Sequence, residues 1–133
     1  MKNLNNYSIN KKKVLFRADL NIPVIGGKIT DNSRIETIKP SIKKLLKQQN
    51  KIFILSHFGR PKADNKNKYS LQFILPTLQK KFGVNKVYFL KNLDGKSISR
   101  KIEEMSFGEI CLIENIRFYP EEEKNDQNFV KQI

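Results

Sequence analysis

The sequence predicts an α/β fold in which helices cover both faces of a mostly parallel sheet. Two observations support this fold class. Short apolar runs alternate along the chain with longer amphipathic segments, and the apolar runs are nearly continuous. Alternation of strand and helix is typical of βαβ units with right-handed crossovers. Nearly continuous apolar strands are typical of sheets that are covered on both faces.

Four strands are expected, because four short runs combine apolar and β-branched residues. These runs are residues 13–18, 51–56, 86–90 and 109–114. Together with the helical patterns between them, they predict a parallel, doubly wound (Rossmann-like) sheet.

The first helical pattern spans residues 31–49, where apolar side chains recur at close to a helical period. Asp31 is the expected N-cap, because its carboxylate can accept hydrogen bonds from amides of the first turn. Pro40 lies inside this segment and predicts a kink or a new helix start, because proline lacks the amide donor of the helical ladder.

A second helix is expected at residues 70–82, and a shorter one at residues 97–105. For the second helix, Ser70 is the expected cap and Gly83 the expected end. Pro76 predicts another kink within it.

Length and composition place limits on the class of protein. The 133 residues are enough for one domain at most. Cys111 is the one cysteine of the chain, which excludes an intrachain disulfide and suits a reducing cytoplasm. No apolar run approaches the length of a membrane span, and residues 1–13 lack the apolar core of a signal peptide. A cytoplasmic location without a membrane partner is therefore expected.

The formal net charge of +13 leaves three interpretations open. It could serve a polyanion such as nucleic acid or a membrane surface, or a small, multiply charged substrate. It could also reflect codon bias, because lysine, asparagine and isoleucine are abundant together. The lysines are scattered with few aromatic residues between them, which weakens the case for nucleic acid.

Polar side chains follow three of the four expected strands. Asp19 and Asn21 follow the first, His57 and Arg60 the second, and Arg117 the last. Ligands of open parallel sheets bind beyond the carboxyl ends of the strands, so these side chains are expected at one edge. Arginine matches carboxylate and phosphate oxygens, and Asp19 and Asn21 can accept hydrogen bonds from hydroxyl groups. The spacing predicts a basic pocket for a small organic anion, in which side chains also accept hydrogen bonds from the hydroxyl groups of that anion.

Arg34 falls in the first turn of the helix expected at residues 31–49, where a cation opposes the helix dipole. It is interpreted either as facing an anion at that helix end or as an ordinary surface arginine. Purely structural roles remain open for the other candidates: a turn or cap for Asp19, a loop position for His57, a solvent-facing turn for Arg60, and pairing with acidic residues 121–123 for Arg117.

Four sequence blocks resemble signatures of the phosphoglycerate kinase family. Residues 14–24 (VLFRADLNIPV) resemble R-x-D-[FL]-N-V-P, and residues 27–35 (GKITDNSRI) resemble G-x-I-T-D-[DN]-[ST]-R-I. Residues 55–62 (LSHFGRPK) are similar to S-H-L-G-R-P, and residues 112–126 (LIENIRFYPEEEKND) to L-[EL]-N-[VL]-R-F-x-P-x-E-E-x-N-D. The blocks occur in family order and together span nearly the whole chain.

The resemblance implies reversible phosphoryl transfer between 1,3-bisphosphoglycerate plus ADP and 3-phosphoglycerate plus ATP. It implies two doubly wound domains, of which the first binds the glycerate phosphate and the second binds the Mg²⁺-nucleotide. It also implies a usually monomeric enzyme of glycolysis and gluconeogenesis.

Carried over residue by residue, the resemblance implies six site residues. Asp19 and Asn21 would bind the hydroxyl and carboxylate end of the glycerate, and Arg34 would be the catalytic arginine beside the reacting acyl phosphate. His57 and Arg60 would join a basic patch, and Arg117 would hold the non-reacting phosphate. The departures, such as Phe58 in place of Leu, touch none of these residues.

Family members are about three times as long as this chain, so residues 1–133 are expected to be a partial N-terminal, 3-phosphoglycerate-binding domain. The nucleotide-binding domain, with its ATP, ADP and Mg²⁺ sites, is expected to be absent, and the fragment to be inactive alone. The alternative function is a non-catalytic basic module that binds nucleic acid, with a steep dependence of affinity on salt.

Overall fold

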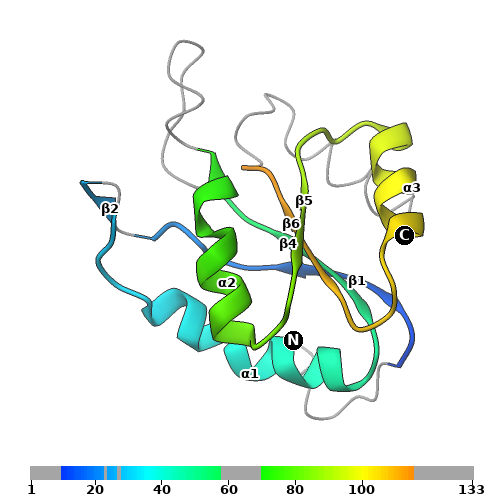
Figure 1. Ribbon diagram of the computed structural model, residues 1–133, viewed down its shortest axis with the longest axis horizontal. Helices are drawn as coiled ribbons and strands as arrows, with labels where there is room; N and C mark the ends of the chain where they lie inside the picture. Colours follow the sequence, from blue (N-terminus) through cyan, green and yellow to red (C-terminus); the bar gives the residue numbers. More distant parts are fainter. Residues whose placement is uncertain (1–9, 23, 27, 58–69, 116–133) are drawn as a thin grey trace.

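The computed structural model of the chain describes residues 10–22, 24–26, 28–57 and 70–115. Four strands within these ranges form one parallel sheet, in the order β1-β4-β6-β5 (Figure 1). The strands are β1 (Lys13–Arg17), β4 (Lys51–Leu55), β5 (Val87–Leu90) and β6 (Ile110–Ile113). The four predicted strands and their parallel arrangement are thus confirmed, with ends that differ by one residue at most.

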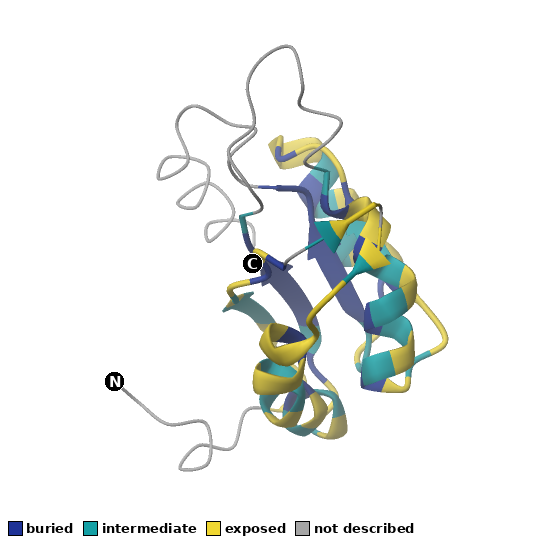
Figure 2. Cartoon of the chain, turned by 90° about the vertical axis from the view of Figure 1, so that its left-hand side faces the viewer, coloured by how far each residue is buried: buried dark blue, intermediate teal, exposed yellow. Residues whose placement is uncertain are grey.

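Helices cover both faces of this sheet, as predicted (Figures 1 and 2). On one face lie α1 (Ser33–Lys47), the short 3-10 helix η3 (Leu71–Ile74) and α2 (Leu75–Phe82), and on the other lies α3 (Gly95–Glu104). Strand β4 contributes side chains to the apolar clusters on both faces of the sheet. Its residues Ile52 and Ile54 pack with α1 and α2, whereas Phe53 and Leu55 pack with α3. All four are almost completely buried, which explains the continuous apolar run.

Helix α1 corrects one prediction and part of a second. Its N-cap is Asn32 and not Asp31, and the Asn32 side chain makes no capping hydrogen bond. Asp31 instead accepts hydrogen bonds from the amide and the hydroxyl of Ser33, a local turn that starts the helix one residue later. The helix continues through Pro40 without a new start. Pro40 is exposed, so water can reach the carbonyl that loses its amide partner there.

The second predicted helix is divided into η3 and α2. The hydroxyl of Ser70 accepts a hydrogen bond from the amide of Gln72, and Gly83 ends α2 with a φ of 68°, so both predicted ends are confirmed. Pro76 lies in the first turn of α2, where its missing amide costs little, and the 3-10 geometry ends just before it.

Two features of the fold were not predicted. Helix α3 begins two residues earlier than expected, because the carboxylate of Asp94 caps it by accepting a hydrogen bond from the amide of Ser97 at 2.8 Å. Strands β2 (Val24–Ile25) and β3 (Lys28–Ile29) form a two-stranded antiparallel hairpin between β1 and α1. No helix in the described ranges has the length and apolar character needed to cross a membrane.

Candidate functional site

The carboxyl ends of β1, β4 and β6 lie side by side, because these strands are parallel neighbours in register. Arg17 at the end of β1 pairs with Leu55 at the end of β4, and Ile54 pairs with Leu112 of β6. The segments that follow therefore leave the sheet at one edge, which we call the carboxyl edge. It includes Asp19 and Asn21 after β1 and His57 after β4.

Asp19 and Arg34 form an ion pair across this edge, although 15 residues separate them in the sequence. Both side chains remain accessible, with exposed fractions of 57% for Asp19 and 45% for Arg34. Arg34, in the first turn of α1, thus has a carboxylate of the protein itself as its partner, and both interpretations of its position stay open. A ligand can reach both partners without rearrangement of the core.

The charges near Asp19 favour its ionised form. Partial burial raises the pKa of Asp19, but this effect is outweighed. The Asn21 amide and the Arg34 guanidinium donate hydrogen bonds to the carboxylate, and the charges of Arg34 and His57 act in the same direction. The net result is a pKa below the usual value for aspartate. Asn21 and His57 therefore belong to the same local electrostatic group as Asp19 and Arg34.

Ser56 connects the segments that carry this group through hydrogen bonds to the backbone. Its hydroxyl, 3% exposed, accepts a hydrogen bond from the amide of Leu20 at 2.8 Å and donates one to the carbonyl of His57. This contact joins the segment after β1 to the end of β4. The sequence pattern identifies Ser56 only as the end of a strand, and the signal that could have revealed its role is a small hydroxyl directly after a run of buried residues.

Glu114 is a second buried polar residue that the sequence pattern assigns to a strand. It is 4% exposed at the end of β6. Its carboxylate accepts hydrogen bonds from the Ser70 hydroxyl at 2.7 Å, the Leu71 amide at 2.9 Å and the Asn115 amide at 2.8 Å. It therefore connects the start of η3 to the carboxyl edge.

Four of the six predicted site residues can be placed: Asp19, Asn21, Arg34 and His57. The structure brings these four together. Arg60 and Arg117 lie outside the described residues. Cys111 is buried in β6, and this burial raises the pKa of its thiol to about 12, which agrees with a packing role.

The arrangement suits an anion that also carries hydroxyl groups. Arg34 supplies a planar set of donors, and Asp19 supplies acceptor oxygens beside it. Among the described residues, no group of three histidine, cysteine or acidic side chains could hold a metal ion.

Comparison with known proteins identifies the family of the chain. A model of the phosphoglycerate kinase family matches residues 4–133. The chain is 42% identical to the phosphoglycerate kinase of Wolbachia pipientis wMel over 98% of its own length and 32% of the relative. It is 39% identical to that of Elusimicrobium minutum over 100% of its length and 33% of the relative. The chain thus spans about a third of the length of these relatives.

Solved structures show the same similarity. The crystal structure of phosphoglycerate kinase from Pyrococcus horikoshii OT3 superimposes with a TM-score of 0.78 at 29% identity, covering 91% of this chain and 29% of that one. The structure of phosphoglycerate kinase from Coxiella burnetii gives a TM-score of 0.70 at 32% identity, covering 86% of this chain and 28% of that one. From the family match over nearly all of its residues, the chain belongs to the phosphoglycerate kinase family.

Proposed function

We propose that the whole protein catalyses reversible phosphoryl transfer between 1,3-bisphosphoglycerate plus ADP and 3-phosphoglycerate plus ATP, and that these 133 residues carry the glycerate-phosphate site. The observation that carries the proposal is the Asp19–Arg34 pair at the carboxyl edge, within two of the sequence blocks that resemble the family. Because the chain spans about a third of its relatives, catalysis is proposed for the whole protein and substrate binding for this chain.

In this proposal Asp19 and Asn21 bind the hydroxyl and carboxylate end of the glycerate. Arg34 contacts the acyl phosphate and stabilises the negative charge that the transferred phosphoryl group carries. Its place at the edge supports the role, because its guanidinium is exposed and already oriented by Asp19. The substrate would share or replace Asp19 as the partner of Arg34.

His57 and Arg60 complete a basic patch, and Arg117 holds the non-reacting phosphate. Of these three, His57 is supported by its electrostatic interaction with Asp19. Arg60 and Arg117 are proposed from the sequence blocks alone. Each follows a strand whose carboxyl end reaches the same edge.

The nucleotide and Mg²⁺ are proposed to bind to a second domain outside this chain. When bound, Mg²⁺ would neutralise charge on the nucleotide phosphates. A monomeric, cytoplasmic protein of glycolysis, without nucleic acid or membrane partners, completes the proposal.

Calorimetric titration of the 133-residue chain with 3-phosphoglycerate tests the site. We expect saturable one-to-one binding, weakened about tenfold or more in Arg34→Ala, because a charged hydrogen bond contributes roughly 1.5–3 kcal/mol. Arg100→Ala is the matched control, since Arg100 is an exposed arginine on α3, across the sheet from α1. Equal affinities for the two variants would contradict the role of Arg34.

Two further measurements test the rest of the proposal. The 133-residue chain should form no ATP from 1,3-bisphosphoglycerate and ADP in a coupled assay, and turnover by the chain alone would contradict the division between two domains. Titration with duplex DNA should show only weak, unsaturable binding. Tight binding that falls steeply with salt would favour the nucleic-acid module instead.

A further inference from the structure

A groove lies between the start of α1 and the body of α2, on the face of the sheet that these helices cover. Its volume is about 460 Å³, within the range of small-molecule sites. Ile29 and Asn32 line it on one side, and Pro76, Thr77, Lys80 and Lys81 line it on the other. Of the residues proposed to bind the glycerate, the four that the structure describes do not line this groove.

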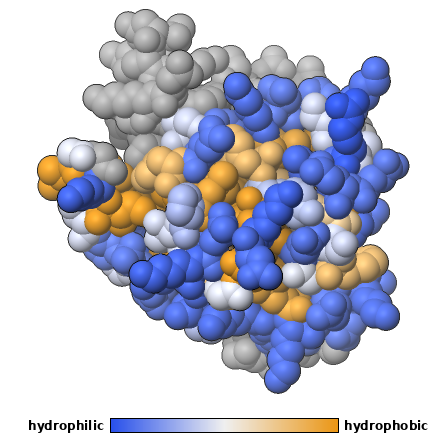
Figure 3. Space-filling view, in the orientation of Figure 1, coloured by the Kyte–Doolittle hydropathy of each residue, from blue (hydrophilic) through white to orange (hydrophobic). Residues whose placement is uncertain are grey.

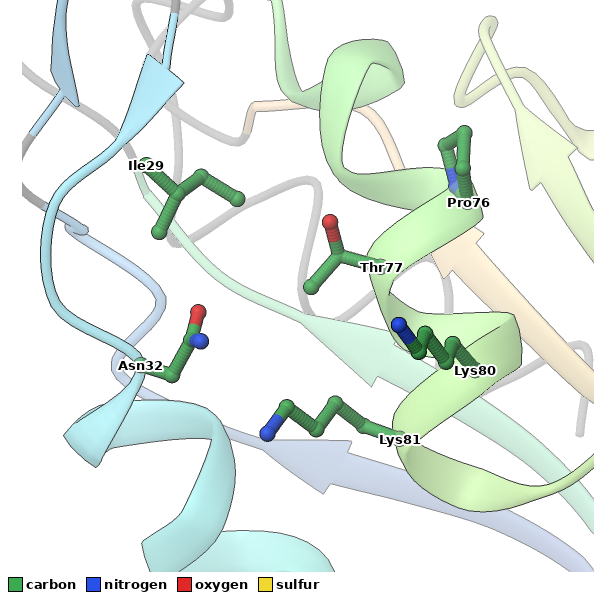
Figure 4. Close-up of a pocket in the computed structure, with 6 residues that line it drawn as sticks. All are labelled: Ile29, Asn32, Pro76, Thr77, Lys80 and Lys81. Carbon is green, nitrogen blue, oxygen red and sulfur yellow. The ribbon is translucent and has the colours of Figure 1, made fainter.

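Four polar side chains line the groove between α1 and α2. Figure 4 shows the amide of Asn32 on one side, and the ammonium groups of Lys80 and Lys81 approaching from α2 with the hydroxyl of Thr77 above them. The Asn32 side chain makes no capping hydrogen bond to α1, so its amide can bind a ligand. The amide, the hydroxyl and the two ammonium groups all carry hydrogen-bond donors, which suits an acceptor-rich ligand.

The charge around the groove is positive. Lys81 pairs with Glu36 at 2.7 Å, and Lys39 lies 4.0 Å from the same carboxylate. Glu36 is therefore shared by two lysines, and these pairs hold its pKa below the usual value. Lys80 has no ion pair in the described part of the chain, so its charge is not neutralised by an acidic side chain there. An anion in the groove would meet this uncompensated ammonium first.

One end of the groove is apolar. Ile29 and Pro76 supply this part of the lining. Figure 3 shows an apolar strip that runs from the β2–β3 hairpin toward α2, with hydrophilic surface beside it. The groove thus offers a cationic, donor-rich end and an apolar end, a combination suited to a phosphate group on a small organic body.

We propose that this groove is a second anion site, which binds a phosphate-bearing small molecule. Lys80 and Lys81 bind the phosphate, Asn32 and Thr77 donate hydrogen bonds to its oxygens, and Ile29 and Pro76 contact the organic part. The site is separate from the Asp19–Arg34 pair, and it does not depend on the function proposed for that pair. Because α1 carries Arg34 and begins at the groove, an occupant would also contact the helix that presents Arg34.

Titration of the isotope-labelled 133-residue chain with inorganic phosphate, followed by ¹H–¹⁵N NMR at constant ionic strength, tests the proposal. We expect saturable shifts of the Thr77, Lys80 and Lys81 amides. Lys80→Ala should weaken this binding about tenfold, the effect of losing one charged hydrogen bond. Lys96→Ala is the matched control, because Lys96 is an exposed lysine on α3.

Two comparisons distinguish binding in the groove from binding elsewhere on the chain. Arg34→Ala should leave the phosphate-dependent shifts of the α2 amides unchanged. If they disappear with Arg34, the signal belongs to the carboxyl edge and the second site is refuted. Equal weakening by Lys80→Ala and Lys96→Ala, or shifts that do not saturate, would show a general charge effect and also overturn the proposal. A well-dispersed spectrum of each variant establishes that it is folded.

Discussion

The carboxyl edge and the opposite edge, where the strands begin and which we call the amino edge, use polar side chains in different ways. The amino edge includes Asn50 and Lys51 at the start of β4, and Gly108, whose amide donates a hydrogen bond to the Asn50 carbonyl at 2.9 Å. At the amino edge, Asn50 is 0% exposed, and its side chain is bonded to backbone: it accepts from the Lys12 amide and donates to the Leu45 carbonyl, both at 2.9 Å. At the carboxyl edge, Asp19 and Arg34 are about half exposed and are bonded to each other. Buried polar side chains connect elements at both edges, as Ser56 and Glu114 do at the carboxyl edge, but the carboxyl edge also carries the exposed Asp19–Arg34 ion pair, which a ligand can reach.

This difference separates stability from binding. Removal of a buried polar side chain whose partners are backbone atoms takes a hydrogen bond from each of them. An exposed ion pair contributes little to stability, because water already solvates its members. Substitution of Asn50 and substitution of the Asp19–Arg34 pair should therefore affect different measurements.

Asn50→Ala should have the largest effect on stability. It leaves the Lys12 amide and the Leu45 carbonyl without their side-chain partner, and we expect a loss of about 3 kcal/mol in the free energy of unfolding. Urea denaturation measures this loss, with exposed Asn85→Ala as control. A stable Asn50→Ala chain would contradict the structural role of the amino edge.

Arg34→Ala should show the opposite pattern. We expect about a tenfold loss of affinity for 3-phosphoglycerate but a change of less than about 0.5 kcal/mol in the free energy of unfolding. Calorimetry and urea denaturation on the same preparation measure both quantities. A large loss of stability would mean that the Asp19–Arg34 pair serves the fold.

Ser56→Ala should fall between these two cases, because Ser56 is buried but supports the carboxyl edge. Loss of the hydrogen bond from Leu20 should reduce the free energy of unfolding by about 1–2 kcal/mol. It should also weaken 3-phosphoglycerate binding, because Leu20 lies between Asp19 and Asn21. Unchanged affinity in a destabilised variant would show that Ser56 acts on the fold alone.

The smallest expected effect is the pH dependence of the Asp19–Arg34 pair. The pKa of Asp19 is lower in the folded chain than the ordinary value of 3.8, so its stabilisation is present above that value and is lost as the pH falls through the folded pKa. Because both side chains are exposed, the contribution is about a few tenths of a kcal/mol. The difference in unfolding free energy between wild type and Asp19→Asn should shrink from about pH 6 toward about pH 2.5. A difference that grows on acidification would contradict the sign.

The sequence predicted most of the sheet, because buried parallel strands leave a strong local signal. Runs such as residues 51–56 can be recognised without tertiary information. The start of α1 was harder to predict, since Asp31 and Asn32 are both good caps and the turn at Ser33 decided between them. The β2–β3 hairpin was missed because strands of two residues leave no periodic pattern.

The sequence predicted which end of the sheet carries Asp19, Asn21 and His57, but it did not predict which side chains contact one another there. Parallel topology placed the residues after β1 and β4 at one edge, and the structure agrees. The pairing of Asp19 with Arg34 joins a loop to a helix, so no local spacing encodes it. Ser56 and Glu114 escaped notice because each is a single polar residue at the end of an apolar run, and only their tertiary partners show what they do.

The central claim is that the carboxyl edge, and not the amino edge, binds the glycerate phosphate. A ¹H–¹⁵N NMR titration of the 133-residue chain with 3-phosphoglycerate tests it most directly. We predict saturable shifts of the Asn21, Arg34 and His57 amides, with the Asn50, Lys51 and Gly108 amides unchanged. Shifts confined to the amino edge, or the absence of saturable shifts at Arg34, would contradict the claim.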